Sequence, residues 1–219
     1  MDSKTFVAGL VAEMHKLFAQ LGDQEALEAE SGGQMEVAAL LKLALTSELE
    51  AAEIAAHWLP TTPEIDAKTL LAEQCADELR HYNLIIERLG ELGEDMDGYD
   101  PMAEGFSPLY QYLRGLRSTP ERVAAGPFAC EAVAEVRNAQ FIAFCRSAGD
   151  ETTAKLYEDI IHPEEIHHHR LGREILERYA TTPEIQAEVA TAVHSSLAIA
   201  EELQTLTEKT TGLVNIPLS

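Results

Sequence analysis

Apolar residues recur along this chain at intervals of three and four, which is the spacing of an amphipathic helix. Phe6, Leu10, Met14 and Leu17 form the first such stripe, and Gly32-Gly33 closes the N-terminal arm that contains it. The alternation of apolar and polar residues that marks a strand is absent, so we expect an all-α fold. Further helices are predicted over residues 35–59, 63–89, 108–116, 120–148, 151–179 and 183–207.

Proline marks the start of three of these helices. In Thr62-Pro63-Glu64, Thr119-Pro120-Glu121 and Thr182-Pro183-Glu184, the threonine suits the N-cap, the proline the first helical position and the acid the positive end of the helix dipole. The glycine-rich stretch 90–106 is the one long segment that looks like a loop. It separates two pairs of helices, where a four-helix bundle needs a crossover connection.

Two Glu-x-x-His steps fall on the second and fourth of the long helices. They are Glu78 to His81 and Glu164 to His167, and the i, i+3 spacing places carboxylate and imidazole on one helix face. Each step follows a glutamate in an Ala-rich helical stretch about thirty residues earlier, Glu48 in the first half and Glu131 in the second. This pattern predicts a metal site enclosed by four helices.

The spacing within the first half supports this interpretation. Glu48 lies 12 residues before Pro60 and Glu78 lies 15 residues after Pro63, so both lie roughly 20 Å from the same turn of an antiparallel hairpin. Leu41 and Ala52 share the stripe of Glu48, which points its carboxylate into the apolar interior. An isolated ionised carboxylate is costly there, and a divalent cation removes that cost.

The third helix offers two candidate ligands. Glu135 lies one turn after Glu131 on the same face. The turn at Gly149-Asp150 lies 14 residues from Glu135 and 18 from Glu131, while Glu164 lies 14 residues after Asp150. Matching the two legs of the hairpin therefore favours Glu135.

The fourth helix is also ambiguous, because Glu165 and His168 form a second Glu-x-x-His in the next register. Subtracting 86 aligns Glu164 with Glu78 and His167 with His81, which favours the pair Glu164 and His167. The same offset aligns several apolar residues of the two halves, as expected for a repeated helix pair.

These residues resemble the ferritin-like di-iron carboxylate superfamily, which includes bacterioferritins, rubrerythrins and the hydroxylase subunits of bacterial multicomponent monooxygenases. The resemblance covers roughly residues 35–179. It implies two Fe ions, with Mn or mixed Fe/Mn as alternatives, and the spacing typical of the family favours Glu131 over Glu135. The ligand set that it implies is Glu48, Glu78, His81, Glu131, Glu164 and His167.

The composition of the chain limits the binding partners and the cellular compartment that we expect. Sixteen Lys and Arg against 38 Asp and Glu give a net charge of −22, which disfavours binding to nucleic acid or to an anionic membrane. Cys75, Cys130 and Cys145 form no Cys-x-x-Cys pair, so a reducing compartment is expected. The first residues lack a signal peptide pattern, which predicts a cytoplasmic protein.

The chain is accordingly predicted to be one ferritin-like domain over residues 1–219, a four-helix bundle with two additions. Residues 1–33 form an N-terminal helical arm, 35–180 the metal-binding bundle and 183–210 an extra C-terminal helix. The resemblance implies an oxidoreductase that activates dioxygen or peroxide on an unknown small organic substrate, and a homodimer is a compatible assembly. The alternatives are a ferroxidase that handles iron and a metal-free helical interaction module.

Overall fold

A computed structural model describes residues 1–18 and 36–211 of the 219-residue chain. Over these ranges the structure is helical and contains no strand, which confirms the predicted all-α class. Gly32-Gly33 and the remainder of the predicted arm after Phe18 lie outside the described residues. The helices are α1 (Ser3–Phe18), α3 (Val37–Trp58), α4 (Ile65–Glu91), α5 (Pro108–Gly115), α6 (Thr119–Val123), α7 (Glu131–Ser147), α8 (Glu151–Leu156), α9 (His162–Tyr179) and α10 (Pro183–Thr211).

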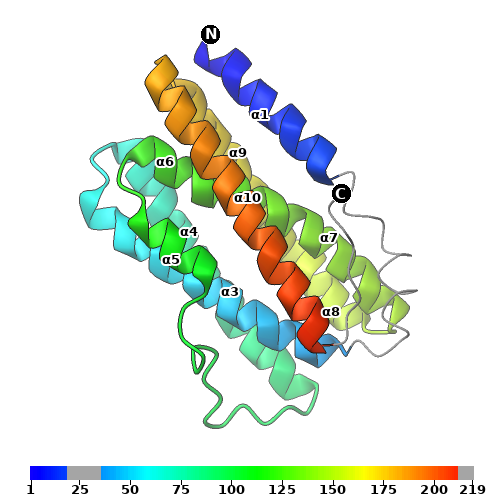
Figure 1. The fold of residues 1–219 in the computed structure, drawn as a ribbon. Coiled ribbons are helices and arrows are strands. Elements are labelled where there is room, and N and C mark those ends of the chain that lie inside the picture. The colour runs from blue at the N-terminus through cyan, green and yellow to red at the C-terminus, as the bar shows by residue number, and fades with distance from the viewer. Residues whose placement is uncertain (19–35, 212–219) are drawn as a thin grey trace.

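The long helices form two hairpins that pack on each other (Figure 1). In the first, a 3-10 turn at Leu59–Thr61 joins α3 to α4. In the second, the chain turns between α7 and α8 at Gly149, whose φ of 81° suits glycine, and Asp150 caps α8 by accepting a hydrogen bond from Thr153 N. Helix α9 contacts both α4 and α7, so the two hairpins meet along it.

The predicted helix starts are right to within two residues, but the capping groups differ. Thr182 does cap its helix, since its hydroxyl accepts from Ile185 N at 3.3 Å. Before α6, however, the cap is Ser118, which forms a capping box with Glu121. Thr62 is not a cap either, because its hydroxyl donates to Trp58 O at 2.9 Å and ties the hairpin turn to α3.

Two π-helical turns interrupt helices that the sequence predicts to be continuous. The first, Ala124–Cys130, contains Pro127 and runs directly into α7. The second, Tyr157–Ile161, lies between α8 and α9 and is followed by Pro163. Proline has no N–H to donate to the preceding turn, and a π-helical turn accommodates one extra residue within an α-helix. Side chains beyond such a turn therefore face a direction that regular helix counting misses.

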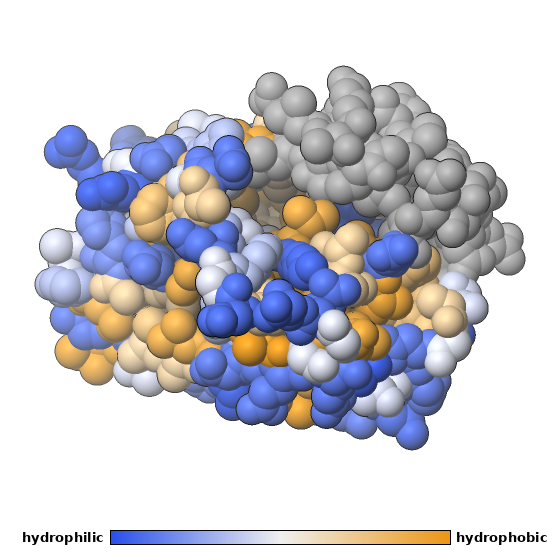
Figure 2. Space-filling model, turned by 90° about the horizontal axis from the view of Figure 1, so that it is seen from below, coloured by the Kyte–Doolittle hydropathy of each residue, from blue (hydrophilic) through white to orange (hydrophobic). Residues whose placement is uncertain are grey.

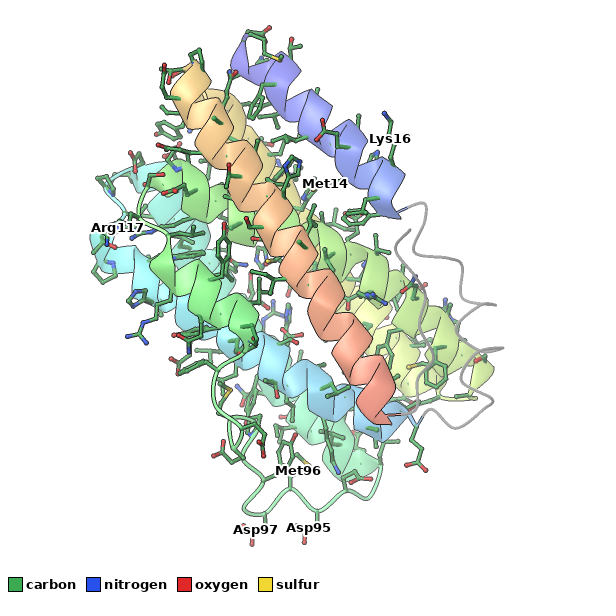
Figure 3. All side chains as sticks on the ribbon, viewed as in Figure 1. Met14, Lys16, Asp95, Met96, Asp97 and Arg117 are labelled. Atoms are coloured by element: carbon green, nitrogen blue, oxygen red, sulfur yellow. The ribbon has the colours of Figure 1, made fainter. Side chains whose placement is uncertain are left out.

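Helices α1 and α10 flank the two hairpins. Helix α1 lies against α9 and α10 (Figure 1). Its residue Met14 is buried and belongs to the same hydrophobic cluster as Val189 and Val193 of α10, whereas Lys16 points outward (Figure 3). Helix α10 packs on α5, α6 and the Ala124–Cys130 turn.

None of the described helices combines the length and the apolar character that a membrane crossing requires. On the face drawn in Figure 2, hydrophobic residues are interspersed with hydrophilic ones.

The two legs of the second hairpin approach each other closely at Gly172 of α9. A Cβ atom there would lie 2.9 Å from Pro127 C and O and 3.0 Å from Phe128 N. Only a residue without a side chain allows α9 to lie this close to the π-helical turn. Gly172 lies one turn after His168, and Pro127 one turn before Glu131, so this contact sets the helix spacing beside the candidate site.

We predict that Gly172→Ala destabilises the fold, because the new methyl group meets backbone atoms that have no rotamer to change. The expected loss in the free energy of unfolding is about 1 to 3 kcal/mol, measured by chemical denaturation. The matched control is Gly90→Ala near the end of α4, where a Cβ meets nothing within 4 Å; it should stabilise by about 0.5 to 1 kcal/mol. Equal effects of the two substitutions would contradict the close approach at Gly172.

Candidate metal centre

Six buried side chains from four helices converge at one place between the two hairpins. Helix α3 supplies Glu48, α4 supplies Glu78 and His81, α7 begins with Glu131, and α9 supplies the last two. The full set is Glu48, Glu78, His81, Glu131, Glu165 and His168, with exposed fractions from 0% to 9%. Four carboxylates and two imidazoles so deeply buried are rare without a charge partner.

Their ligand atoms form two groups, and within each group all atoms lie within 4.8 Å of one another. The first group is Glu48, Glu78, His81 and Glu165, and the second is Glu78, Glu131, Glu165 and His168. Glu78 and Glu165 belong to both groups. Two neighbouring cation positions that share two carboxylates follow from this arrangement.

Both imidazoles present Nδ1 to the shared carboxylates. His81 Nδ1 lies 3.0 Å from Glu78 Oε2 and 3.2 Å from Glu48 Oε2. His168 Nδ1 lies 3.6 Å from Glu78 Oε1 and 3.7 Å from Glu165 Oε2. The two Glu-x-x-His steps thus occupy equivalent positions on opposite sides of the site.

The expected pair Glu164 and His167 is corrected to the alternative pair, Glu165 and His168. The side chain of His167 is 39% exposed, and its Nε2 lies 3.2 Å from Glu73 Oε1 at the surface. The physical reason is the π-helical turn at Tyr157–Ile161. Because it holds one extra residue, the two halves match at the site with an offset of 165 − 78 = 87, not 86.

The third helix contributes Glu131, whose Oε1 accepts a hydrogen bond from Gln74 Nε2. Glu135 is only half-buried and belongs to neither ligand group. Counting residues from the Gly149 turn favoured Glu135, but the structure brings Glu131 into a ligand group instead.

An outer layer of charged residues orients the two imidazoles. His81 Nε2 lies 2.7 Å from Glu164 Oε2, and His168 Nε2 lies 3.2 Å from Asp77 Oδ2. A carboxylate that accepts a hydrogen bond from Nε2–H would leave Nδ1 with a lone pair for a metal. Arg80 pairs with both acids, with Asp77 at 3.0 Å and with Glu164.

Sequence reasoning missed this outer layer, although the sequence carries a signal for it. An acid directly precedes each shared glutamate, as Asp77-Glu78 and Glu164-Glu165. Each outer acid serves the histidine of the other half. The structure places Glu164 outside both ligand groups, beside the imidazole of His81.

The electrostatics of the site favour a bound cation. Burial and the nearby Glu165 carboxylate raise the pKa of Glu78 well above its usual range, and burial with the same neighbour does so for Glu131. Although burial lowers the pKa of His81, hydrogen bonds with Glu48 and Glu78 raise it to about 11. These shifts mean that Glu78, Glu131 and His81 hold protons when no cation is bound at the site.

Three atoms at the centre of the site test whether a metal fits. Glu78 Oε1, Glu165 Oε2 and His168 Nδ1 are buried and have no hydrogen-bond partner. Buried polar atoms are nearly always paired, and each of these belongs to one of the two ligand groups. The donor set of carboxylate oxygens and imidazole nitrogens suits first-row transition metals. The residues present fit a pair of such ions.

Comparison of this chain with protein-family models, with curated proteins and with solved structures gives no match. The assignment of the site therefore depends on its own geometry.

We predict that His168→Ala loses most of the bound metal, because the second ligand group loses its imidazole. The matched control is His167→Ala, the adjacent residue, whose side chain lies at the surface; it should keep the metal content of the unaltered protein. Metal analysis of both variants, purified in parallel from iron-supplemented cells, measures the difference. If His167→Ala lost its metal and His168→Ala kept it, the ligands would be Glu164 and His167, as first expected.

A second prediction concerns stability without metal. Folding of the metal-free protein at neutral pH must protonate Glu131, because burial and the nearby Glu165 raise its pKa. Glu131→Gln removes this cost, and the glutamine carbonyl oxygen still accepts the hydrogen bond from Gln74. The metal-free variant should gain roughly 1 to 3 kcal/mol in free energy of unfolding, the size of one unpaired buried polar group, while its metal affinity falls. Glu135→Gln is the control and should change neither quantity measurably. A destabilised Glu131→Gln protein would contradict the repulsion described above.

Proposed function

We propose that this chain is a di-metal carboxylate protein with a ferritin-like four-helix arrangement, and that it is an oxidoreductase acting on dioxygen or peroxide. The observation that supports this proposal best is the pair of ligand groups that share Glu78 and Glu165. Two ions so close and so similarly ligated suit a reaction that needs more than one electron. Iron is the proposed metal, with manganese or a mixed pair as the alternatives.

Each residue has a role in this proposal. Glu78 and Glu165, which belong to both ligand groups, would help to hold both ions. Glu48 and His81 would complete one group, and Glu131 and His168 the other. The ions, when bound, supply electrons and Lewis acidity for the reduction of an oxygen species. The protein supplies a fixed ligand geometry and a dry surrounding, with Leu41, Leu45 and Ile161 buried in the adjacent hydrophobic cluster.

The outer residues keep that geometry in place. Gln74 holds the Glu131 carboxylate by a hydrogen bond. Glu164 and Asp77 each keep the proton of one imidazole on Nε2, which raises the basicity of Nδ1 toward a metal. Arg80 balances part of the charge of both acids.

The proposal predicts a defined stoichiometry. Anaerobic titration of the metal-free full chain with Fe(II) should reach saturation near two ions per chain, and the His168→Ala variant should fall short of that value. Subsequent addition of oxygen should produce an absorption change whose amplitude scales with bound iron.

The same titration, repeated in air with excess Fe(II), distinguishes the alternatives. An enzyme centre should stop loading near two ions per chain in a small assembly. Hundreds of ions per particle in a large hollow assembly would overturn the proposal in favour of iron storage. Absence of stoichiometric binding would overturn it in favour of a metal-free helical module.

A further inference from the structure

A cavity of about 200 Å³ lies between α3 and α7, outside the ligand groups. Its apolar wall consists of Leu40 and Ala44 from α3, Phe141 and Phe144 from α7, and Tyr157 from the π-helical turn before α9. The rings of Phe141 and Tyr157 meet edge to face, with centroids 4.7 Å apart. The volume is below the roughly 300 to 1,000 Å³ of pockets for drug-sized ligands, so the cavity suits a molecule with a single ring.

This cavity is next to the candidate metal centre. Ala44 lies four residues before Glu48 on α3, and Asn138, another lining residue, lies seven after Glu131 on α7. These separations place the cavity about one and two helical turns from the two ligands, or ~6 and ~10 Å of rise, on the same helix faces.

Tyr157 connects the two regions. Its ring lines the cavity, and its hydroxyl is buried without a hydrogen-bond partner. Burial, followed by the charge of Glu48, raises its pKa well above the usual range, and Glu165 adds to the effect. A ligand in the cavity would therefore contact a residue that lies within electrostatic reach of Glu48 and Glu165.

The polar part of the cavity wall carries a positive charge. Arg137, Asn138 and Gln140 line the cavity from α7, and Arg137 Nη1 donates to Gln140 Oε1 at 3.3 Å. Among the described residues that line the cavity, Arg137 is the one with a cationic side chain. In a chain with a net charge of −22, an arginine beside an aromatic wall selects for an anionic group on a flat apolar body.

We propose that this cavity holds the organic substrate of the metal centre, and that the substrate is a small aromatic carboxylic acid. Its ring packs against Phe141, Phe144 and Tyr157, and its carboxylate faces Arg137. This inference rests on the function proposed above, and it adds the class of substrate and the place where that substrate binds.

Benzoate and its neutral isostere benzamide are suitable probes, titrated calorimetrically into the metal-free full chain. Benzoate should bind more tightly than benzamide. Ala44→Phe fills the cavity and should weaken both ligands by roughly ten-fold or more, about 1.4 kcal/mol. The control Ala39→Phe adds the same ring at an exposed position of α3 and should leave binding unchanged.

The role of Arg137 is tested by charge removal. Arg137→Gln should abolish the preference for benzoate over benzamide and leave benzamide binding nearly constant. Arg146→Gln removes the same charge from an exposed position of the same helix and should retain the preference. Equal benzoate affinity in Ala44→Phe and Ala39→Phe, or no preference for benzoate in the unaltered chain, would overturn this inference.

Co(II) loading then connects the cavity to the metal centre. Benzoate should change the visible spectrum of the Co(II)-loaded chain, and Ala44→Phe should bind Co(II) with the same stoichiometry but show no change with benzoate. Metal uptake without benzoate binding would overturn this inference alone. Benzoate binding without any metal uptake would overturn the proposed function together with the substrate role.

Discussion

The mutual repulsion of four buried carboxylates is the constraint on which the rest of this structure depends. Two unit charges 4 Å apart repel by about 4 kcal/mol even at an effective dielectric constant of 20, and a whole domain is stable by only about 5 to 15 kcal/mol. Glu48, Glu78, Glu131 and Glu165 therefore cannot all be ionised together without compensation. Protons or cations must occupy the space between them, and the unpaired inward atoms of Glu78, Glu165 and His168 favour cations.

The helix geometry meets this constraint through two irregular turns. The π-helical turn at Tyr157–Ile161 rotates Glu165 and His168 into the interior, and the turn at Ala124–Cys130 precedes Glu131 directly. Gly172 lets α9 approach the turn at Ala124–Cys130 closely. Two regular helices with larger side chains at the crossing would lie further apart, and the ligand atoms of α7 and α9 would no longer lie within reach of one ion.

Much of the fold and part of the candidate site could be predicted from the spacing of apolar residues and from the positions of proline and glycine. The helices, the crossover and three of the six clustered residues follow from apolar spacing, proline positions and the first Glu-x-x-His, whereas only the resemblance to a known family favoured Glu131 over Glu135. The register of α9 could not be predicted, because a π-helical turn arises from tertiary packing and from the missing N–H of Pro163, and an alignment of two amphipathic helices is insensitive to one inserted residue. The doubled acids Asp77-Glu78 and Glu164-Glu165 were the overlooked signal, since the second acid of each pair joins the ligand groups and the first lies beside the histidine of the other half.

The same doubled acids make the two hairpins depend on each other. Each ligand group takes a shared glutamate from both hairpins, and each imidazole is oriented by an outer acid of the opposite hairpin, His81 by Glu164 and His168 by Asp77. Neither hairpin alone can therefore assemble one complete metal position. Because metal binding to a site absent from the undocked chain is also folding free energy, docking of the hairpins and uptake of the proposed metal would belong to one linked equilibrium. In that proposal, the repulsion that destabilises the metal-free protein would also drive cation binding by the folded state.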